Sequence, residues 1–175
     1  AITSVPGLRD VAVRRAKGAS AIQHNKFLVL TREGTPVAVW TGSTNITTSG
    51  IFGHFNVCHV HSAPGIGLAF LRYYEMLKTD PSLDALKAFN EQTPLPSLAG
   101  GWTGAHCIFS PRKSDKALRL YSDLIRTASQ AVFLTAAFGL SATITEGLLH
   151  APPGSLAAVK AGVPVSALPK EAHHG

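Results

Sequence analysis

Charged residues are scarce in this chain, and their scarcity excludes whole classes of protein. Only 15% of the 175 residues are Asp, Glu, Lys or Arg, whereas 45% are apolar. A disordered segment needs the opposite balance, because it lacks the apolar side chains that would fill a core. The composition therefore indicates a core-forming chain, long enough for one ordinary domain or one and a half small ones.

Cysteines and long apolar runs are also few. Cys58 and Cys107 lie far apart without metal-ligand spacing, so we expect two buried thiols and not a disulfide framework. No window approaches the roughly 20 apolar residues of a membrane-spanning helix. The chain begins at Ala1 without a signal-peptide pattern. This predicts an internal piece of a longer protein and indicates no cellular compartment.

Positive charge exceeds negative charge. The formal net charge is +6 and the pI is about 9.6, which favours an anionic partner such as a phospholipid headgroup or a nucleic acid. The basic residues are scattered and never form a run of five. They also do not alternate with aromatic residues in the pattern that stacks bases. Composition therefore leaves lipid and nucleic acid equally open.

Residues 22–45 carry the strongest functional signal. His24 and Lys26 precede an apolar run, a turn at Glu33-Gly34 follows, and a second apolar run leads to the polar segment 42–45. Alternate side chains of a strand share a face, so His24 and Lys26 are expected to project together. The turn predicts that the two apolar runs are neighbouring strands of a hairpin.

Ser43 and Asn45 are expected to share a face in the same way, at the end of the second strand. Four different polar groups then converge at one end of the hairpin. A neutral imidazole can attack phosphorus, while an ammonium, a hydroxyl and an amide can hold phosphate oxygens. His24, Lys26, Ser43 and Asn45 therefore outline a phosphodiester site.

The types of these residues and their order along the chain point to a family. His24-x-Lys26, followed sixteen residues after Lys26 by Gly42-Ser43-x-Asn45, resembles the HxK(x)4D(x)6GSxN signature of the phospholipase D superfamily. Two positions depart from the pattern. Thr31 stands where the family usually has Asp, and Asn56 stands where related nucleases carry a Glu that orients the histidine. With Thr31 in place of Asp, we expect a structural hydrogen bond to be lost. With Asn56 in place of Glu, we expect His24 to be held less firmly.

The resemblance implies a phosphodiesterase that needs no metal or other cofactor. His24 would be the nucleophile that becomes a phosphohistidine, or its acid partner. Lys26 and Asn45 would bind the phosphate, with Ser43 as a supporting hydroxyl. The family includes phospholipases, cardiolipin synthases and nucleases, so the substrate is a phospholipid or nucleic-acid phosphodiester, and the reaction is hydrolysis or phosphatidyl transfer.

The chemistry of this family requires two histidines, and one motif supplies one. The second motif would come from a missing C-terminal half of the protein or from a homodimer partner that meets the first at a two-fold axis. The sequence after the motif has no place in a minimal single-motif protein, which favours the fragment. We therefore expect the isolated chain to be inactive or nearly so.

The resemblance also implies an α/β fold, with a mixed sheet flanked by helices on both faces and the start of a second similar lobe. Residues 1–92 would form the C-terminal part of a first lobe, 93–101 a linker rich in Pro and Gly, 102–150 the opening βαβ unit of a second lobe, and 151–175 an irregular tail. We expect strands at 11–15, 26–30, 36–41, 55–61, 105–110 and 131–138, a polar loop at 47–50, and helices at 66–78, 81–90, 114–129 and 141–149.

Three neighbouring histidines raise the alternative of a metal site. His59 and His61 share a face of the expected strand, and His54 lies nearby. No Cys or carboxylate stands at a recognised ligand spacing from them, which favours structural or pocket-lining roles.

Two further hypotheses concern function. A non-catalytic phosphodiester-binding module is favoured by Thr31, by Asn56 and by the absent second motif. A serine hydrolase that uses Ser43 is poorly supported, because the segment is not the strained G-x-S-x-G elbow and no acid is placed to complete a triad.

Overall fold

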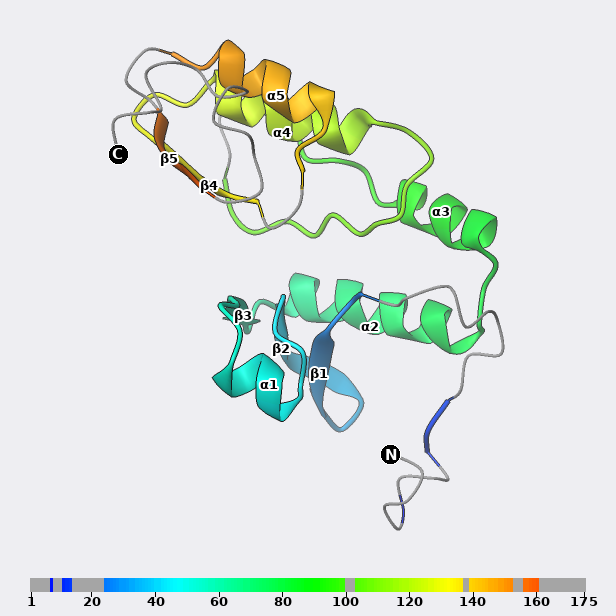
Figure 1. Cartoon of the computed structure of the whole chain (residues 1–175). Helices are drawn as coiled ribbons and strands as arrows, with labels where there is room; N and C mark the ends of the chain where they lie inside the picture. Colours follow the sequence, from blue (N-terminus) through cyan, green and yellow to red (C-terminus); the bar gives the residue numbers. More distant parts are fainter. Residues whose placement is uncertain are drawn as a thin grey trace. The chain divides into compact units, whose positions relative to one another are not determined.

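The computed structural model describes residues 7, 11–13, 24–99, 103–136, 139–152 and, for the backbone, 156–160. The chain divides into two compact units (Figure 1). The first contains the described residues up to Asn90 together with Gly104–Pro111, and the second contains those of Glu91–Thr103 and those from Arg112 onward. Each unit is described by itself below.

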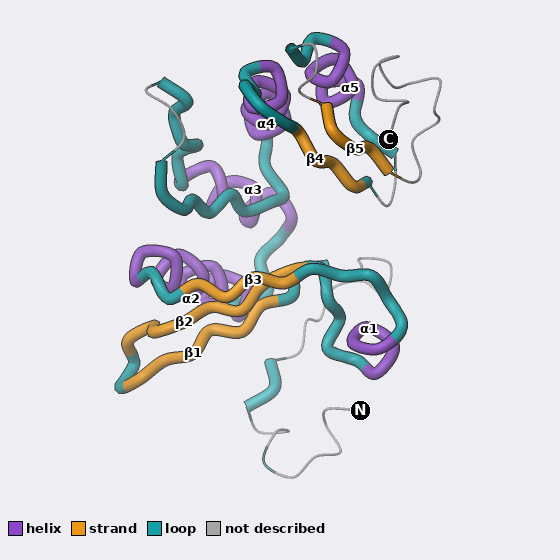
Figure 2. Tube along the Cα trace, turned by 90° about the vertical axis from the view of Figure 1, so that its left-hand side faces the viewer, coloured by secondary structure: helices purple, strands orange, loops and turns teal. Residues whose placement is uncertain are grey.

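A three-stranded antiparallel sheet forms the centre of the first unit. Its strands are β1 (Phe27–Arg32), β2 (Thr35–Gly42) and β3 (Cys58–His61), and β2 lies between the other two (Figure 2). The turn predicted between β1 and β2 is confirmed: Glu33 and Gly34 both have positive φ, 51° and 77°. That pair of values belongs to a two-residue turn whose twist matches the flanking strands.

Among the described residues, a helix covers only one face of this sheet, so the prediction of helices on both faces is wrong for this part of the chain. The prediction of a mixed sheet is also wrong here, because all three strands are antiparallel. Helix α2 (Pro64–Lys78) packs on the face that carries Phe27 and the fully buried Val39. Alternate residues point the other way, and there Leu28, Leu30 and Val60 are 56%, 63% and 70% exposed. An apolar run along the sequence does not by itself show that both faces are buried.

Three helices of the chain differ in part from the predicted elements. Helix α1 (Thr48–Phe52) occupies the segment predicted as a polar loop, and the Thr47 hydroxyl caps it by accepting a hydrogen bond from Gly50 N at 3.1 Å. Helix α2 is confirmed, with Pro64 in its first turn. Helix α3 (Leu83–Gln92) begins later than predicted, and the hydroxyl of Ser82 accepts from Ala85 N at 3.2 Å.

The prediction of a strand at 105–110 is also wrong. These residues form neither helix nor strand, and they pack on the first unit through rings. Phe109 stacks on Tyr73 with ring centroids 4.4 Å apart and meets Phe70 edge-on at 5.0 Å. The Tyr73 hydroxyl donates to Ser110 O at 3.1 Å, and the side-chain amide of Asn90 donates to Pro111 O at 2.8 Å. Aromatic contacts to α2 hold this segment in place of strand pairing.

The second unit does contain a βαβ arrangement, although it lies two elements further along the chain than predicted. Helix α4 (Lys116–Arg126) precedes β4 (Val132–Thr135), α5 (Ala142–Leu149) and β5 (Leu156–Lys160), and β4 and β5 pair in parallel. The backbone of β5 lies in the segment predicted as an irregular tail. Residues 153–155 and 161–175 of that tail lie outside the described part.

The core of the second unit is small and lies between α4, α5 and β4. Ile125, Ile144 and Leu148 are buried, and partly buried side chains of β4 pack against them. The two helices approach closely at Gly147, where an added Cβ would lie 2.6 Å from the Ser122 hydroxyl oxygen. Small residues at this crossing therefore set how closely α4 and α5 can pack.

An ion pair connects the two segments that begin the second unit. Arg112 Nη2 lies 3.4 Å from Glu91 Oε2 and donates to Thr93 O at 3.0 Å. The backbone N–H of Lys113 donates to Glu91 Oε1 at 3.0 Å. That N–H, aided by the Arg112 guanidinium, holds the pKa of the Glu91 carboxyl below its usual value. These bonds fix the start of the predicted linker against Arg112.

Two remaining expectations concern the N-terminal strand and membrane spans. Val11–Val13 are described and do not form a strand, and Arg14 and Arg15 lie outside the described part. Within the described ranges, every helix is too short or too polar to cross a bilayer.

Candidate functional site

The hairpin register determines where the polar motif lies. Phe27, the first residue of β1, pairs with Thr41, near the end of β2. The residues just before β1 and those just after β2 therefore meet at one end of the sheet, as the sequence predicts. The Thr41 hydroxyl donates to Lys26 O at 3.3 Å and joins the two strands at this point.

His24 and Lys26 lie together at this end, as expected from their spacing. Lys26 Nζ donates to His24 O at 2.5 Å and lies 3.5 Å from His24 Nδ1. His24 is exposed and Lys26 is half-buried. Among the described residues no carboxylate contacts either side chain, so the Lys26 ammonium is available to an anion that approaches from solvent.

Ser43 closes a loop that spans residues 43–57. Its backbone N–H donates to Val57 O at 2.9 Å, and its hydroxyl accepts from Val57 N at 3.1 Å. The same hydroxyl donates to Asn56 Oδ1 at 3.1 Å. Ser43 is thus committed to loop closure, which makes it a support for its neighbours.

Asn56 takes part in this closure and does not contact His24. Its amide nitrogen donates to Gly50 O at 3.1 Å while its oxygen accepts from Ser43. The sequence predicts that an Asn here holds the histidine less firmly than a Glu would. Over the described part of the chain His24 has no orienting carboxylate, and Asn56 holds the two sides of the loop together instead.

The Asn45 side chain is exposed and makes no hydrogen bond within the described ranges. Its backbone oxygen accepts from Thr47 N at 2.8 Å, and an added Cβ at Gly50 would lie 2.2 Å from that oxygen. The close approach of Gly50 therefore fixes the backbone at Asn45 and leaves the amide in solvent. No direct hydrogen bond among the described residues joins His24 or Lys26 to Ser43 or Asn45; the strand register relates the two pairs.

A pocket of about 310 Å³ opens beside the motif. Lys26, Thr41 and Gly42 form the sheet side of its wall, and His61, His106 and Cys107 are among the other lining residues. Burial raises the pKa of the Cys107 thiol, so the thiol is neutral near pH 7. The sequence suggests a pocket-lining role for His61, and this is confirmed. His106 and Cys107 were missed, because nothing in the sequence indicates that 105–110 returns to the first sheet.

A second pocket, of about 480 Å³, lies on the α2 side of the β1 start. It shares Lys26 with the first pocket, and its apolar lining includes Val13, Ile46 and Leu77. Lys26 therefore stands between a pocket with several polar lining groups and a larger, more apolar one.

Thr31, the other departure from the motif, lies far from these groups. It pairs with Pro36 next to the turn, after an irregularity in the register at Leu30. Thr31 lies five residue steps along the strand from Lys26, which corresponds to about 16 Å. The side chain at this position therefore acts on the hairpin and cannot touch a substrate bound at Lys26.

The histidines and cysteines form no metal cluster within the described ranges. His59 and His61 share a face as predicted, and their rings stack with centroids 6.1 Å apart. Both cysteines are free thiols; Cys107 is half-buried, whereas the prediction of burial is wrong for Cys58, which is exposed. Ser43 has no histidine or acid bonded to it in the described part, so the geometry lacks the partners of a serine nucleophile.

No protein-family model, no curated protein and no solved structure matches the chain. The functional argument therefore rests on the residues and their geometry.

Proposed function

We propose that this chain carries one half of a phospholipase D-type phosphodiesterase site. The observation that carries the proposal is the pairing of Phe27 with Thr41, because it brings the HxK segment and the GSxN segment to the same end of one hairpin. The residue types of the motif and their order along the chain support the same conclusion independently of the fold, although ten residues separate Thr31 from Gly42 where the signature has six. The finer fold assignment, a phospholipase D-like lobe followed by the start of another, is part of this proposal.

In the proposed reaction His24 attacks phosphorus through a ring nitrogen, and the bond from phosphorus to the leaving oxygen breaks. A second histidine, outside this motif, gives that oxygen its proton. Water, or an alcohol in a transfer reaction, then attacks the phosphohistidine and restores the imidazole. Exposure of His24 to solvent suits a group that must reach an incoming phosphate.

Lys26 and Asn45 would stabilise the negative charge that develops on the phosphate oxygens. The Lys26 ammonium contacts only His24 among the described residues, and the Asn45 amide has no hydrogen bond there. The Asn45 amide, and the ammonium N–H groups of Lys26 that do not bond to His24, can act on an oxyanion without first breaking an internal bond. Ser43 contributes by fixing the loop that carries Asn45.

The proposed site is incomplete without a second motif, so the purified chain is expected to show no phosphodiesterase turnover as a monomer. The test is hydrolysis of bis(p-nitrophenyl) phosphate in the presence of EDTA, with the molecular mass measured in the same buffer. Turnover that appears only with dimer formation would support a shared two-fold site. Strong turnover by a monomer would contradict the half-site.

One observation favours a non-catalytic phosphodiester-binding module as a second candidate. A nucleophilic histidine is ordinarily oriented by a carboxylate, and Asn56 is engaged with Ser43 and Gly50. Replacing His24 by alanine separates the candidates, since a binding module keeps most of its affinity for a phosphodiester and an enzyme loses turnover.

A further inference from the structure

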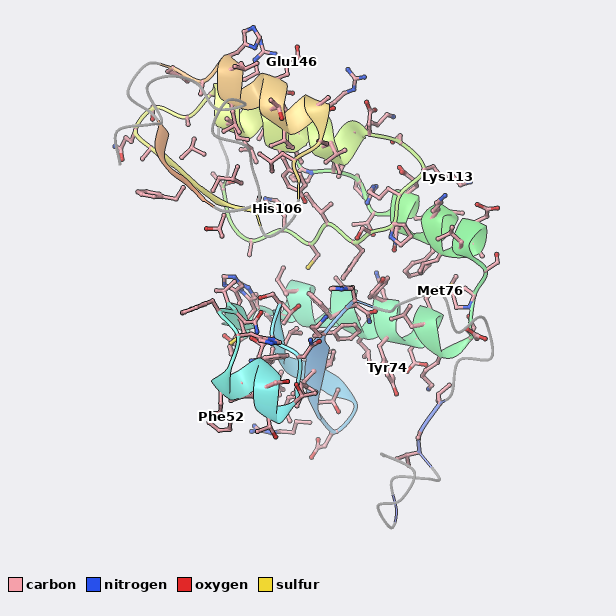
Figure 3. The ribbon with its side chains drawn as sticks, viewed as in Figure 1. Phe52, Tyr74, Met76, His106, Lys113 and Glu146 are labelled. Carbon is pink, nitrogen blue, oxygen red and sulfur yellow. The ribbon has the colours of Figure 1, made fainter. Side chains whose placement is uncertain are left out.

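The loop of residues 43–57 presents apolar side chains to solvent. Its ends are joined by the hydrogen bonds between Ser43 and Val57, so it forms a closed surface loop of the Ω type. Phe52 is 85% exposed and Phe55 is fully exposed. Figure 3 shows Phe52 on the outer side of α1. The other large apolar residues of the loop, all more than half exposed, are Ile46, Ile51 and Val57.

The interior of the loop explains why these side chains point outward. Gly50 packs against the backbone of Asn45, and Asn56 reaches across to Gly50 O. Backbone contacts and small polar side chains therefore hold the loop together, and both phenyl rings lie outside it. Surface loops seldom carry several exposed apolar side chains close together. Where such side chains cluster, they mark an interaction site.

The charge around the loop is one-sided. No Asp or Glu occurs between Glu33 and Glu75, a stretch that includes β2, the loop, β3 and the start of α2. Lys26 and Arg72 lie at the margins of this stretch, and the whole chain carries +6. This stretch of the chain therefore presents no carboxylate to an anionic surface that approaches the loop. The loop itself contains no Lys or Arg, so it lacks the side chains that bind a nucleic-acid backbone.

We propose that the loop of residues 43–57 docks on a phospholipid bilayer, with Phe52 and Phe55 inserted at the boundary between headgroups and acyl chains. Aromatic and aliphatic side chains on a short element bind this boundary by burying apolar area, and anionic lipids add attraction for a basic protein. Because Ser43 and Asn45 lie in the same loop, docking would bring the proposed phosphate-binding end of the sheet near the headgroups. The proposal does not depend on catalysis.

Vesicle flotation of the purified chain tests this docking. The probes are vesicles of phosphatidylcholine alone and of phosphatidylcholine with a quarter of phosphatidylglycerol. The wild type is expected to float with both and more completely with the second. The double variant Phe52→Ser, Phe55→Ser is expected to lose at least about tenfold in partition coefficient, because two rings no longer leave water. The double variant with Leu at both positions is expected to stay within about threefold of wild type.

Two controls make the result specific. Phe133→Ser removes an equally apolar ring that is 78% exposed on β4 of the other unit, and it is expected to float like wild type. His24→Ala is also expected to float like wild type, so a failure of the phosphodiesterase proposal leaves this test intact. Equal flotation of the Ser variant and the wild type would overturn the docking. A wild-type chain that does not bind vesicles would also overturn the docking, even if that chain binds DNA or forms a dimer through these two rings.

Discussion

Replacing His24 by alanine is expected to lower kcat for phosphodiester hydrolysis by about a thousandfold or more in an active assembly of this chain. That loss corresponds to about 4 kcal/mol of transition-state stabilisation. The reason is that, in the proposed site, His24 is the motif residue that attacks phosphorus, whereas Lys26 and Asn45 would be oxyanion donors. Under the proposed function, the active assembly would be the homodimer or the chain joined to a second half that carries its own HxK motif.

The matched control for this experiment is His54→Ala. His54 is an exposed histidine in the neighbouring loop, and its removal is expected to leave kcat within about twofold, as for a surface residue without a role in the site. Affinity for a phosphodiester should fall only a few-fold in His24→Ala. A variant that retains a tenth or more of the wild-type kcat would contradict the nucleophilic role.

Gly42→Ala is expected to destabilise the first unit by about 3 kcal/mol. Gly42 pairs with Cys58, and an added Cβ would lie 2.2 Å from Val57 O and 2.6 Å from Cys58 Cα. Both are backbone atoms, so β3 must move away from β2, and the bonds between Ser43 and Val57 lengthen with it. Chemical denaturation measures the change in the free energy of unfolding.

Gly65→Ala is the matched control, because no atom of the described residues lies within 4 Å of a Cβ at that position in the first turn of α2. It is expected to be neutral or to stabilise by up to about 1 kcal/mol, since alanine favours the helix more than glycine does. If Gly42→Ala and the wild type had the same free energy of unfolding, the close approach of β3 to Gly42 would not be required for stability, which would contradict this prediction.

Local sequence rules predicted the part of the structure that carries the motif. The Glu33-Gly34 turn, the apolar runs on either side and the helix 66–78 all appear as expected, because turn chemistry and apolar periodicity act over a few residues. The meeting of His24 and Lys26 with the end of β2 follows from the hairpin alone. That part of the candidate site needed no knowledge of the rest of the fold.

Features that depend on distant contacts could not be predicted in this way. The segment 105–110 looks like a strand, yet Phe109 stacks on Tyr73 thirty-six residues earlier, and no local pattern encodes that contact. β5 forms only because β4 offers it a parallel partner. The sequence suggested that Asn56 holds His24 less firmly than a Glu would. In the structure Asn56 bonds to Ser43 and Gly50 instead, and this loop closure can be recognised only from the fold.

The central claim is that His24, Lys26 and Asn45 form a phosphate-binding end of the hairpin. The most direct measurement is an NMR titration of the isotopically labelled chain with dimethyl phosphate, which needs neither turnover nor a second motif. The account predicts that the signals of His24, Lys26 and Asn45 shift together along one binding curve, while that of His54 stays unchanged. Shifts confined to other residues, or shifts that persist when Lys26 and Asn45 are both replaced by alanine, would contradict it.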